Sequence, residues 1–307
     1  MTFNIDLPEP QATTGTHVNR IPRRPTFRSR HRGLDSFLRH KVAVAASFVL
    51  LAVVLFAYVG PLFWTYDAGE PTRDLSVPPS LEHPFGTDSL GYDLLAEVMR
   101  GTQRSLLIAL VVGLGATVIG SIWGLISGLA GGKIDALMMR GVDLTLMFPV
   151  IVVASFLGFQ AGASASGWLW VAVVLMLMSW PPVARIVRGV SLSLKQEEYV
   201  ATARATGASR LWIVLRHIVP NALGPITVAA SILVATSVLA ESTLSYLGFG
   251  VRPPDTSLGL LINEAQASVN TRPWLFLIPG MFIVTIGICF SFIGDGLRDA
   301  LSEERSK

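Results

Sequence analysis

The side chains that could carry chemistry in this chain are few, and they match no catalytic motif. The nearest approach to a phosphate-binding loop is Gly132-Lys133, which has Ser127 at the first glycine position and Ile134 where Ser or Thr is needed. Neither H-E-x-x-H nor G-x-S-x-G occurs. Cys289 is the only cysteine and lies in an apolar block, which favours a small buried side chain. We therefore predict no catalytic, metal or cofactor site on this chain, and no enzyme activity.

Two acidic residues lie within apolar blocks, where ionisable groups are rare and are functional candidates. Glu241 is near the end of the fifth block, and Asp143 is near the start of the third. Glu241 could line or gate a translocation path, or it could pair with a local charge such as Arg252. For Asp143 we favour a place at an interface or a local pair with Arg140.

The segment with the most informative spacing is the polar loop of residues 184–221. Its first part, about 194–206, is a helix candidate, and Gly207 then permits a backbone bend that other residues resist. Ser209 is placed to cap a second helix, and Pro220 is expected to end or kink that helix and to start the turn into the fifth span. The second helix has an apolar face at helical spacing, formed by Leu211, Val214, Leu215 and Ile218.

A short helix held off a membrane by such a bend could dock into a groove on another protein. Its small side chains, Ala201, Ala203 and Ala205, would allow close approach. Periodicity alone leaves a second interpretation open, because many membrane proteins carry an amphipathic helix at the interface.

The elements that must position these residues are membrane spans. Hydrophobic residues make up 51% of the 307 residues and charged residues only 15%, against about 25% in soluble domains. The apolar residues gather in blocks long enough to cross about 30 Å of hydrocarbon as helices. The predicted fold class is an all-α membrane protein with six transmembrane helices, at about 42–64, 105–130, 142–160, 168–183, 222–246 and 274–294.

The second predicted span carries small residues at every fourth position: Ala116, Gly120, Gly124 and Gly128. This stripe lets another helix approach closely. It could be a seam near a moving interface, but we favour tight packing within one subunit.

Positive charge predicts the orientation of the spans. If the N-terminus is cytoplasmic, 19 of the 24 Lys and Arg residues fall on the inside, which favours both termini inside. The basic arm, residues 1–41, is predicted to be largely disordered with a short helix before the membrane. It could contact anionic lipid or serve only as a topology signal. The transmembrane domain would then cover 42–294, followed by a cytoplasmic tail, 295–307.

The stretch Glu198–Asn221 resembles the EAA loop of ABC-importer permeases, in the binding-protein-dependent transport family. The alanine triplet of that loop aligns with residues 201–203, its glycine with Gly207 and its proline with Pro220. The chain departs from the pattern where Ala201 replaces a glutamate and Thr202 replaces an alanine.

Further motifs extend the resemblance over about residues 42–304 and favour the peptide-importer branch. Tyr92 departs from that branch, where arginine is common. The matching stretches are His83–Asp88, Gly91–Asp93, Ser245–Gly250 with Pro253-Pro254, Arg216–Asn221 and Gly294–Asp299.

The resemblance implies a type I ABC-importer permease fold with a cytoplasmic coupling helix, in a C-type subunit of a dipeptide or oligopeptide importer at the inner membrane. It implies a homologous B-type permease subunit, one or two ABC ATPase subunits that carry ATP and Mg, and an extracytoplasmic peptide-binding protein; nucleic acid is not a partner. The residues implied in ATPase coupling are Glu198, Tyr199, Ala201, Thr202, Ala203, Arg204, Gly207 and Pro220.

Two alternatives stay open at this stage. The same permease role could serve nickel, haem or glutathione, although no His/Cys cluster marks a metal path. A secondary transporter without an ATPase would be expected to show charged pairs or broken helices at mid-membrane.

Overall fold

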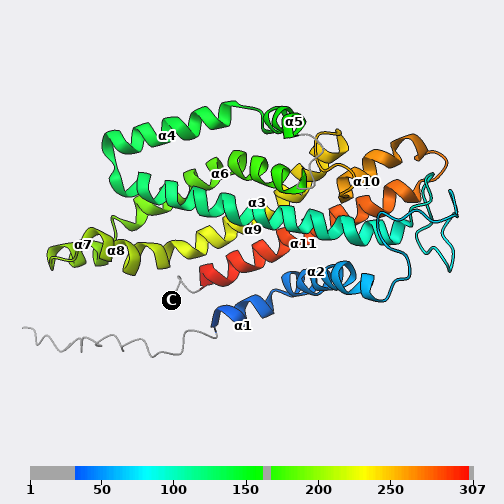
Figure 1. Cartoon of the computed structure of the whole chain (residues 1–307). Helices are drawn as coiled ribbons and strands as arrows, with labels where there is room; N and C mark the ends of the chain where they lie inside the picture. The colour runs from blue at the N-terminus through cyan, green and yellow to red at the C-terminus, as the bar shows by residue number, and fades with distance from the viewer. Residues whose placement is uncertain (1–31, 162–166, 304–307) are drawn as a thin grey trace, which may run out of the picture.

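The computed structural model describes residues 32–161 and 167–303 (Figure 1). Most of the predicted basic arm, the short loop before the fourth span and the last four residues lie outside these ranges. Every regular element in the described part is helical. The α-helices are α1 (Arg32–Arg39), α2 (Lys41–Val59), α3 (Leu94–Ala130), α4 (Gly132–Met147), α5 (Val150–Ala161), α6 (Gly167–Leu194), α7 (Glu198–Ala205), α8 (Arg210–Ile213), α9 (Val219–Tyr246), α10 (Leu258–Ala265) and α11 (Trp274–Glu303).

Five of the described helical segments are long and apolar enough to cross a membrane, and the bent pair α4 and α5 makes a sixth. This agrees with the predicted number of spans. The five are Lys41–Leu62, Leu94–Ala130, Gly167–Leu194, Arg210–Tyr246 and Trp274–Leu301. The predicted helix before the membrane is confirmed as α1.

Helix α3 begins eleven residues before the predicted span because a capping residue precedes it. The Asp93 side chain accepts a hydrogen bond from the Ala96 backbone N at 2.9 Å. Gln103 and Arg104, which hydropathy assigned to the preceding loop, instead lie on the helix and bond to neighbouring elements. Gln103 donates to the Ala57 carbonyl at 2.6 Å, and Arg104 pairs with Asp255 at 2.9 Å.

The third span is a broken helix, and it begins before the predicted residue 142, because the stretch between the second and third predicted spans is helical. Gly131, with φ of +65°, ends α3, and α4 starts at the next residue. The chain then bends by 74° between α4 and α5. Pro149 stands at this break, where it cannot donate a backbone hydrogen bond and disfavours helix for the residue before it.

The boundaries predicted around the coupling loop also need correction. Helix α6 passes through Pro181 and Pro182 and continues to Leu194. Beyond α7, the chain forms one helical segment from Arg210 to Tyr246 instead of turning at Pro220. A π-helical turn, η3 (Val214–Ile218), precedes that proline, and the wider turn relieves the clash between its ring and the carbonyl four residues earlier.

Helix α3 is packed closely against α6 through the small-residue stripe. A Cβ added to Gly124 would lie 2.5 Å from the Ala184 carbonyl oxygen, and one added to Gly120 would lie 2.6 Å from that of Trp180. A Cβ on Gly128 would lie 2.7 Å from the Ser191 Cβ. The stripe therefore serves packing within one subunit, as predicted.

Most of the long helices lie roughly along one direction, whereas α5 is turned away from it, and the polar segments gather at the two ends of the molecule (Figure 1). Figure 1 shows α7 and α8 at one end, and the irregular segment 63–93 together with α10 at the other. We call segment 63–93 the cap loop. The end of α11 packs on the N-terminal helices, because a Cβ on Gly296 would lie 2.3 Å from the Ala43 Cβ.

Candidate functional site

Helix α7 is a short exposed helix anchored by one buried side chain. Val200 is fully buried and forms a cluster with Ile213 and Ile218. Leu125 and Leu129, near the end of α3, pack against this cluster. The anchor thus fixes α7 to α3 and to the start of the fifth span.

The opposite face of α7 is exposed and carries most of the residues predicted to contact an ATPase. Ala203 is half-buried because it packs on the anchor cluster. The other predicted residues on this helix are exposed: Glu198, Tyr199, Ala201, Thr202 and Arg204.

The bend predicted after this helix is present. Gly207 has φ of +85°, a left-handed conformation that glycine adopts without steric cost. Ser209 then caps α8, because its hydroxyl accepts from the Trp212 backbone N at 3.3 Å. The π turn alters the predicted apolar face, so Ile218 is buried while Leu211 and Leu215 are 67% and 62% exposed.

Pro220 is exposed, but it belongs to the next long helix and not to α7. It stands in the first turn of α9, beyond the whole of α8 and η3. The structure therefore places the predicted residues 198–207 on α7 and its bend, and Pro220 on α9, while the Tyr199 ring of α7 lies 5.6 Å from the His217 ring, three residues before Pro220.

Glu241 is completely buried between three elements. Its Oε2 accepts from the Ser105 hydroxyl of α3 at 2.9 Å, and its Oε1 accepts from the Ser245 hydroxyl of α9 at 2.8 Å. Ser105 also accepts from the backbone N of Leu258, the first residue of α10. Serine hydroxyls, rather than Arg252, thus hold this carboxyl group, and its role as a gate stays a prediction.

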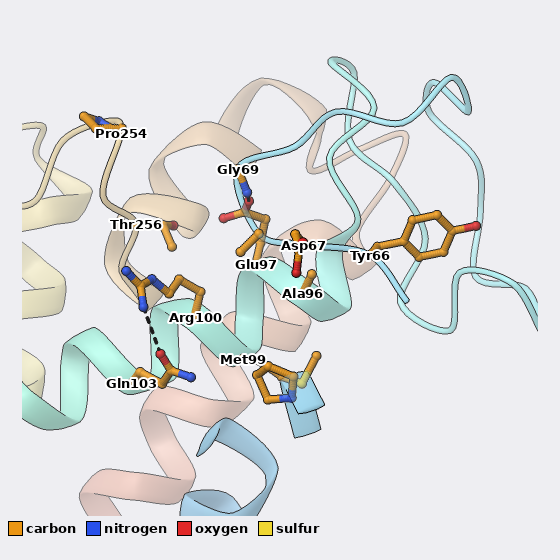
Figure 2. Close-up of a pocket in the computed structure, with 12 residues that line it drawn as sticks. Tyr66, Asp67, Gly69, Ala96, Glu97, Met99, Arg100, Gln103, Pro254 and Thr256 are labelled. Atoms are coloured by element: carbon orange, nitrogen blue, oxygen red, sulfur yellow. Dashed lines mark hydrogen bonds between the residues drawn. The ribbon is translucent and has the colours of Figure 1, made fainter. Parts of the chain in front are cut away.

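A polar pocket of about 320 Å³ lies at the end opposite α7 (Figure 2). The start of the cap loop, the first turns of α3 and the segment before α10 line it. It contains both signs of charge, since Glu97 and Arg100 stand on its α3 wall. Glu97 accepts from the Gly69 backbone N at 2.7 Å, and Arg100 donates to Gln103 at 3.2 Å.

Comparison of the sequence with models of known protein families identifies the family of this chain. Residues 120–303 match the family described as "Binding-protein-dependent transport system inner membrane component". The chain belongs to that family. Residues 31–79 also match the N-terminal transmembrane domain of oligopeptide transport permease C. The chain is therefore a multi-pass membrane component of such a transport system, and not an enzyme in its own right.

Relatives cover nearly the whole chain. The oligopeptide transport system permease protein OppC of Mycobacterium tuberculosis (strain ATCC 25618 / H37Rv) is 40% identical over 86% of this chain and 91% of its own. The protein of the same name from Escherichia coli (strain K12) is 41% identical over 86% and 88%, respectively. That of Bacillus subtilis (strain 168) is 34% identical over 89% and 90%.

A solved structure confirms the fold class. A chain of the MetNI methionine ABC transporter, in an inward-facing conformation, superposes with a TM-score of 0.57 at 20% identity. The match covers 66% of this chain and 95% of that one. The fold of this family member is thus that of an ABC-importer permease.

Two ion pairs connect α6 to α4, and neither of them was predicted from the sequence. Arg188 of α6 makes two hydrogen bonds to Asp135 of α4, with Nε at 2.6 Å from Oδ1 and Nη2 at 2.7 Å from Oδ2. Asp143 pairs with Arg185 of α6 at 2.6 Å, and not with Arg140, which was one of the two alternatives predicted for it. Each pair joins residues more than forty positions apart, so neither is visible in local spacing.

Proposed function

We propose that the chain is the C-type permease subunit of an ATP-driven di- or oligopeptide importer and forms half of its translocation path. The cargo assignment rests on relatives named as oligopeptide permeases that match over most of both chains. The observation that carries the mechanism is α7, whose face is exposed while Val200 anchors its other side.

The connections of α7 suit it to pass motion into the spans. A short turn joins it to α6, and Gly207 joins it through α8 to the helix that continues as α9. The anchor cluster adds contact with α3. An ATPase that pulls on α7 would therefore act on three spans at once, shifting the population between inward- and outward-facing states.

The partners follow from this role. A homologous B-type permease subunit would supply the other half of the path, and one or two ABC ATPase subunits would bind ATP and Mg and dock on α7. An extracytoplasmic peptide-binding protein would deliver cargo to the cap-loop end. In this proposed role, α7 and both termini would lie in the cytoplasm. The contact between His40 of the N-terminal part and Asp299 near the C-terminus, at 3.5 Å, supports a common side for the two ends.

Site-specific crosslinking tests the coupling role. In a Cys289→Ser background, Ala201→Cys places a thiol on the exposed face of α7, and Leu81→Cys places one in the cap loop. We expect a bifunctional thiol reagent to join Ala201→Cys, but not Leu81→Cys, to a co-purified ATPase. An ATPase that co-purifies yet crosslinks only from the cap loop would refute docking at α7.

Co-purification tests the assembly itself. Gentle detergent extraction followed by mass spectrometry should recover a second permease, an ATPase and a peptide-binding protein. If no ATPase is recovered even after crosslinking, the proposed ATPase-coupled assembly is wrong.

A further inference from the structure

One ring nitrogen of a buried histidine in the cap loop has no hydrogen-bond partner. His83 is 2% exposed, and its Nε2 is a buried atom without such a partner. Buried polar atoms are satisfied in the great majority of cases, so an exception needs a physical explanation.

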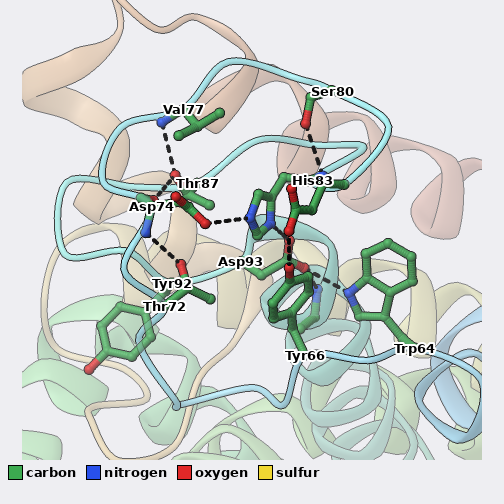
Figure 3. Close-up of polar contacts among 12 residues, drawn as sticks. Trp64, Tyr66, Thr72, Asp74, Val77, Ser80, His83, Thr87, Tyr92 and Asp93 are labelled. Carbon is green, nitrogen blue, oxygen red and sulfur yellow. Dashed lines mark hydrogen bonds and ion pairs between the residues drawn. The ribbon is translucent and has the colours of Figure 1, made fainter.

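The other ring nitrogen is firmly held. His83 Nδ1 lies 2.7 Å from Asp93 Oδ2 (Figure 3). The second oxygen of Asp93 accepts from Trp64 Nε1 at 3.0 Å and from the Ala96 backbone N at 2.9 Å. Because Nδ1 is engaged by Asp93, Nε2 is the ring nitrogen of His83 that is left to meet a ligand.

Two carboxylates lie beside this imidazole. Nε2 lies 3.6 Å from Asp74 Oδ2, and one ligand atom each of Asp74, Glu82 and His83 falls within 4.8 Å of the others. The Tyr66 ring stacks on His83 with centroids 4.7 Å apart, and its hydroxyl donates to Glu82 Oε1 at 3.0 Å. Tyr66 thus holds both the imidazole and the second carboxylate in place.

We propose that Asp74, Glu82 and His83 bind one divalent transition-metal ion of the zinc class. Ligands about 2.1 Å from a tetrahedral zinc ion stand about 3.4 Å apart, close to the 3.6 Å separation of Nε2 and Asp74 Oδ2. That separation is too long for a hydrogen bond. Asp93, His83 and the ion then form the carboxylate–histidine–metal arrangement that fixes the tautomer of a metal ligand. The exposed side of the site leaves the fourth position to water.

The site would fasten the cap loop to helix α3. Asp93 caps α3 while it orients His83, so a bound ion links Asp74 and Glu82 through His83 to that helix. A cross-link that forms only in the folded chain stabilises it, and the binding free energy adds to the stability of the loop.

Zinc titration of the whole chain tests this site. The protein, purified without a polyhistidine tag and stripped with EDTA, is titrated with Zn²⁺ by calorimetry and by thermal unfolding. We expect one equivalent to bind and to raise Tm. Asp74→Asn and Glu82→Gln each remove an exposed carboxylate without touching the His83–Asp93 bond, and each should weaken binding at least tenfold.

The matched control is Asp67→Asn, an exposed carboxylate of the same loop outside the cluster, which should bind zinc like the native chain. Absence of saturable zinc binding would overturn the proposal. So would equal affinity in Asp74→Asn, Glu82→Gln and the native chain. These readouts do not depend on transport, so they stand apart from the proposed importer function.

Discussion

The ion pair between Asp135 and Arg188 is the single contact whose loss should reduce the stability of the folded chain most. Asp135 is 8% exposed and receives two hydrogen bonds from Arg188 and one from Ser127. Arg188→Ala would leave a buried carboxylate short of its partner, which costs on the order of 2 kcal/mol. Thermal or denaturant unfolding in detergent measures the loss.

A matched pair provides the control. Arg185 and Asp143 are joined at a similar distance, but about half of each side chain is exposed. Exposed pairs contribute between about 0 and 1 kcal/mol, so Arg185→Ala should change stability little. Equal losses in the two variants would show that burial does not set the value of the Asp135 pair.

A second residue-scale prediction concerns pH. Although the residue is exposed, partial desolvation of the Glu264 carboxyl group, followed by the negative charges of Glu97 and Asp88, raises its pKa from 4.5 to about 7. The folded chain therefore holds this proton more tightly than the unfolded chain does. The resulting stability is complete below pH 4.5 and is lost as the pH rises through about 7.

Glu264→Gln removes this titration. We expect the Tm of the native chain to fall between pH 5.5 and pH 8 by more than that of Glu264→Gln, with Glu70→Gln, an exposed cap-loop carboxylate, as the control. Parallel Tm curves for the native chain and Glu264→Gln would exclude the contribution.

At the scale of elements, the contact of α3 with α6 depends on the absence of side chains. Gly124→Ala would place its Cβ 2.5 Å from a backbone carbonyl oxygen, so the helices must separate. Overpacking of this kind costs about 1 to 3 kcal/mol. Gly189→Ala, on a face of α6 with no atom near the new Cβ, should be neutral or stabilising by up to about 1 kcal/mol. Unfolding in detergent compares the stabilities of the two variants. If Gly124→Ala were as stable as the native chain, α3 and α6 could move apart at no cost, and the close contact would not contribute to stability.

The helices themselves were largely predictable, but their ends and bends were not. Hydropathy located each span because lipid demands a run of apolar residues. It misplaced the start of α3 because polar residues such as Gln103 remain helical when their side chains find partners. The bend at Pro149 and the π turn before Pro220 depend on how a proline ring is accommodated, which composition does not reveal.

The candidate site was predictable only where its signals are local. Gly207 and Ser209 were identified correctly because a bend and a cap are properties of neighbouring residues. The cluster at Asp74, Glu82 and His83 escaped notice, since its ligands meet only after the cap loop has folded on Asp93.

At the scale of the whole molecule, the bend at Gly207 should decide whether α7 can transmit motion. Proline fixes φ near −65° and cannot adopt the +85° found there. Gly207→Pro should therefore abolish peptide uptake, while the chain still inserts in the membrane and co-purifies with its permease partner. Uptake in proteoliposomes or cells measures the effect, and native uptake by this variant would contradict the coupling role of α7.

The length of α3 has a mechanical consequence. Its 37 residues make a rod of about 55 Å, well beyond the roughly 30 Å of hydrocarbon. Asp93 and the cap loop are attached at the N-terminal end of α3. Near its C-terminal end, Leu125 and Leu129 pack against the anchor cluster of Val200, Ile213 and Ile218. A tilt of about 5° would displace the far tip by about 5 Å over that length. One stiff helix thus connects the cap loop at one face of the membrane with the α7 region at the other. A movement at one end of α3 is therefore transmitted directly to the other end, without a series of contacts between separate elements.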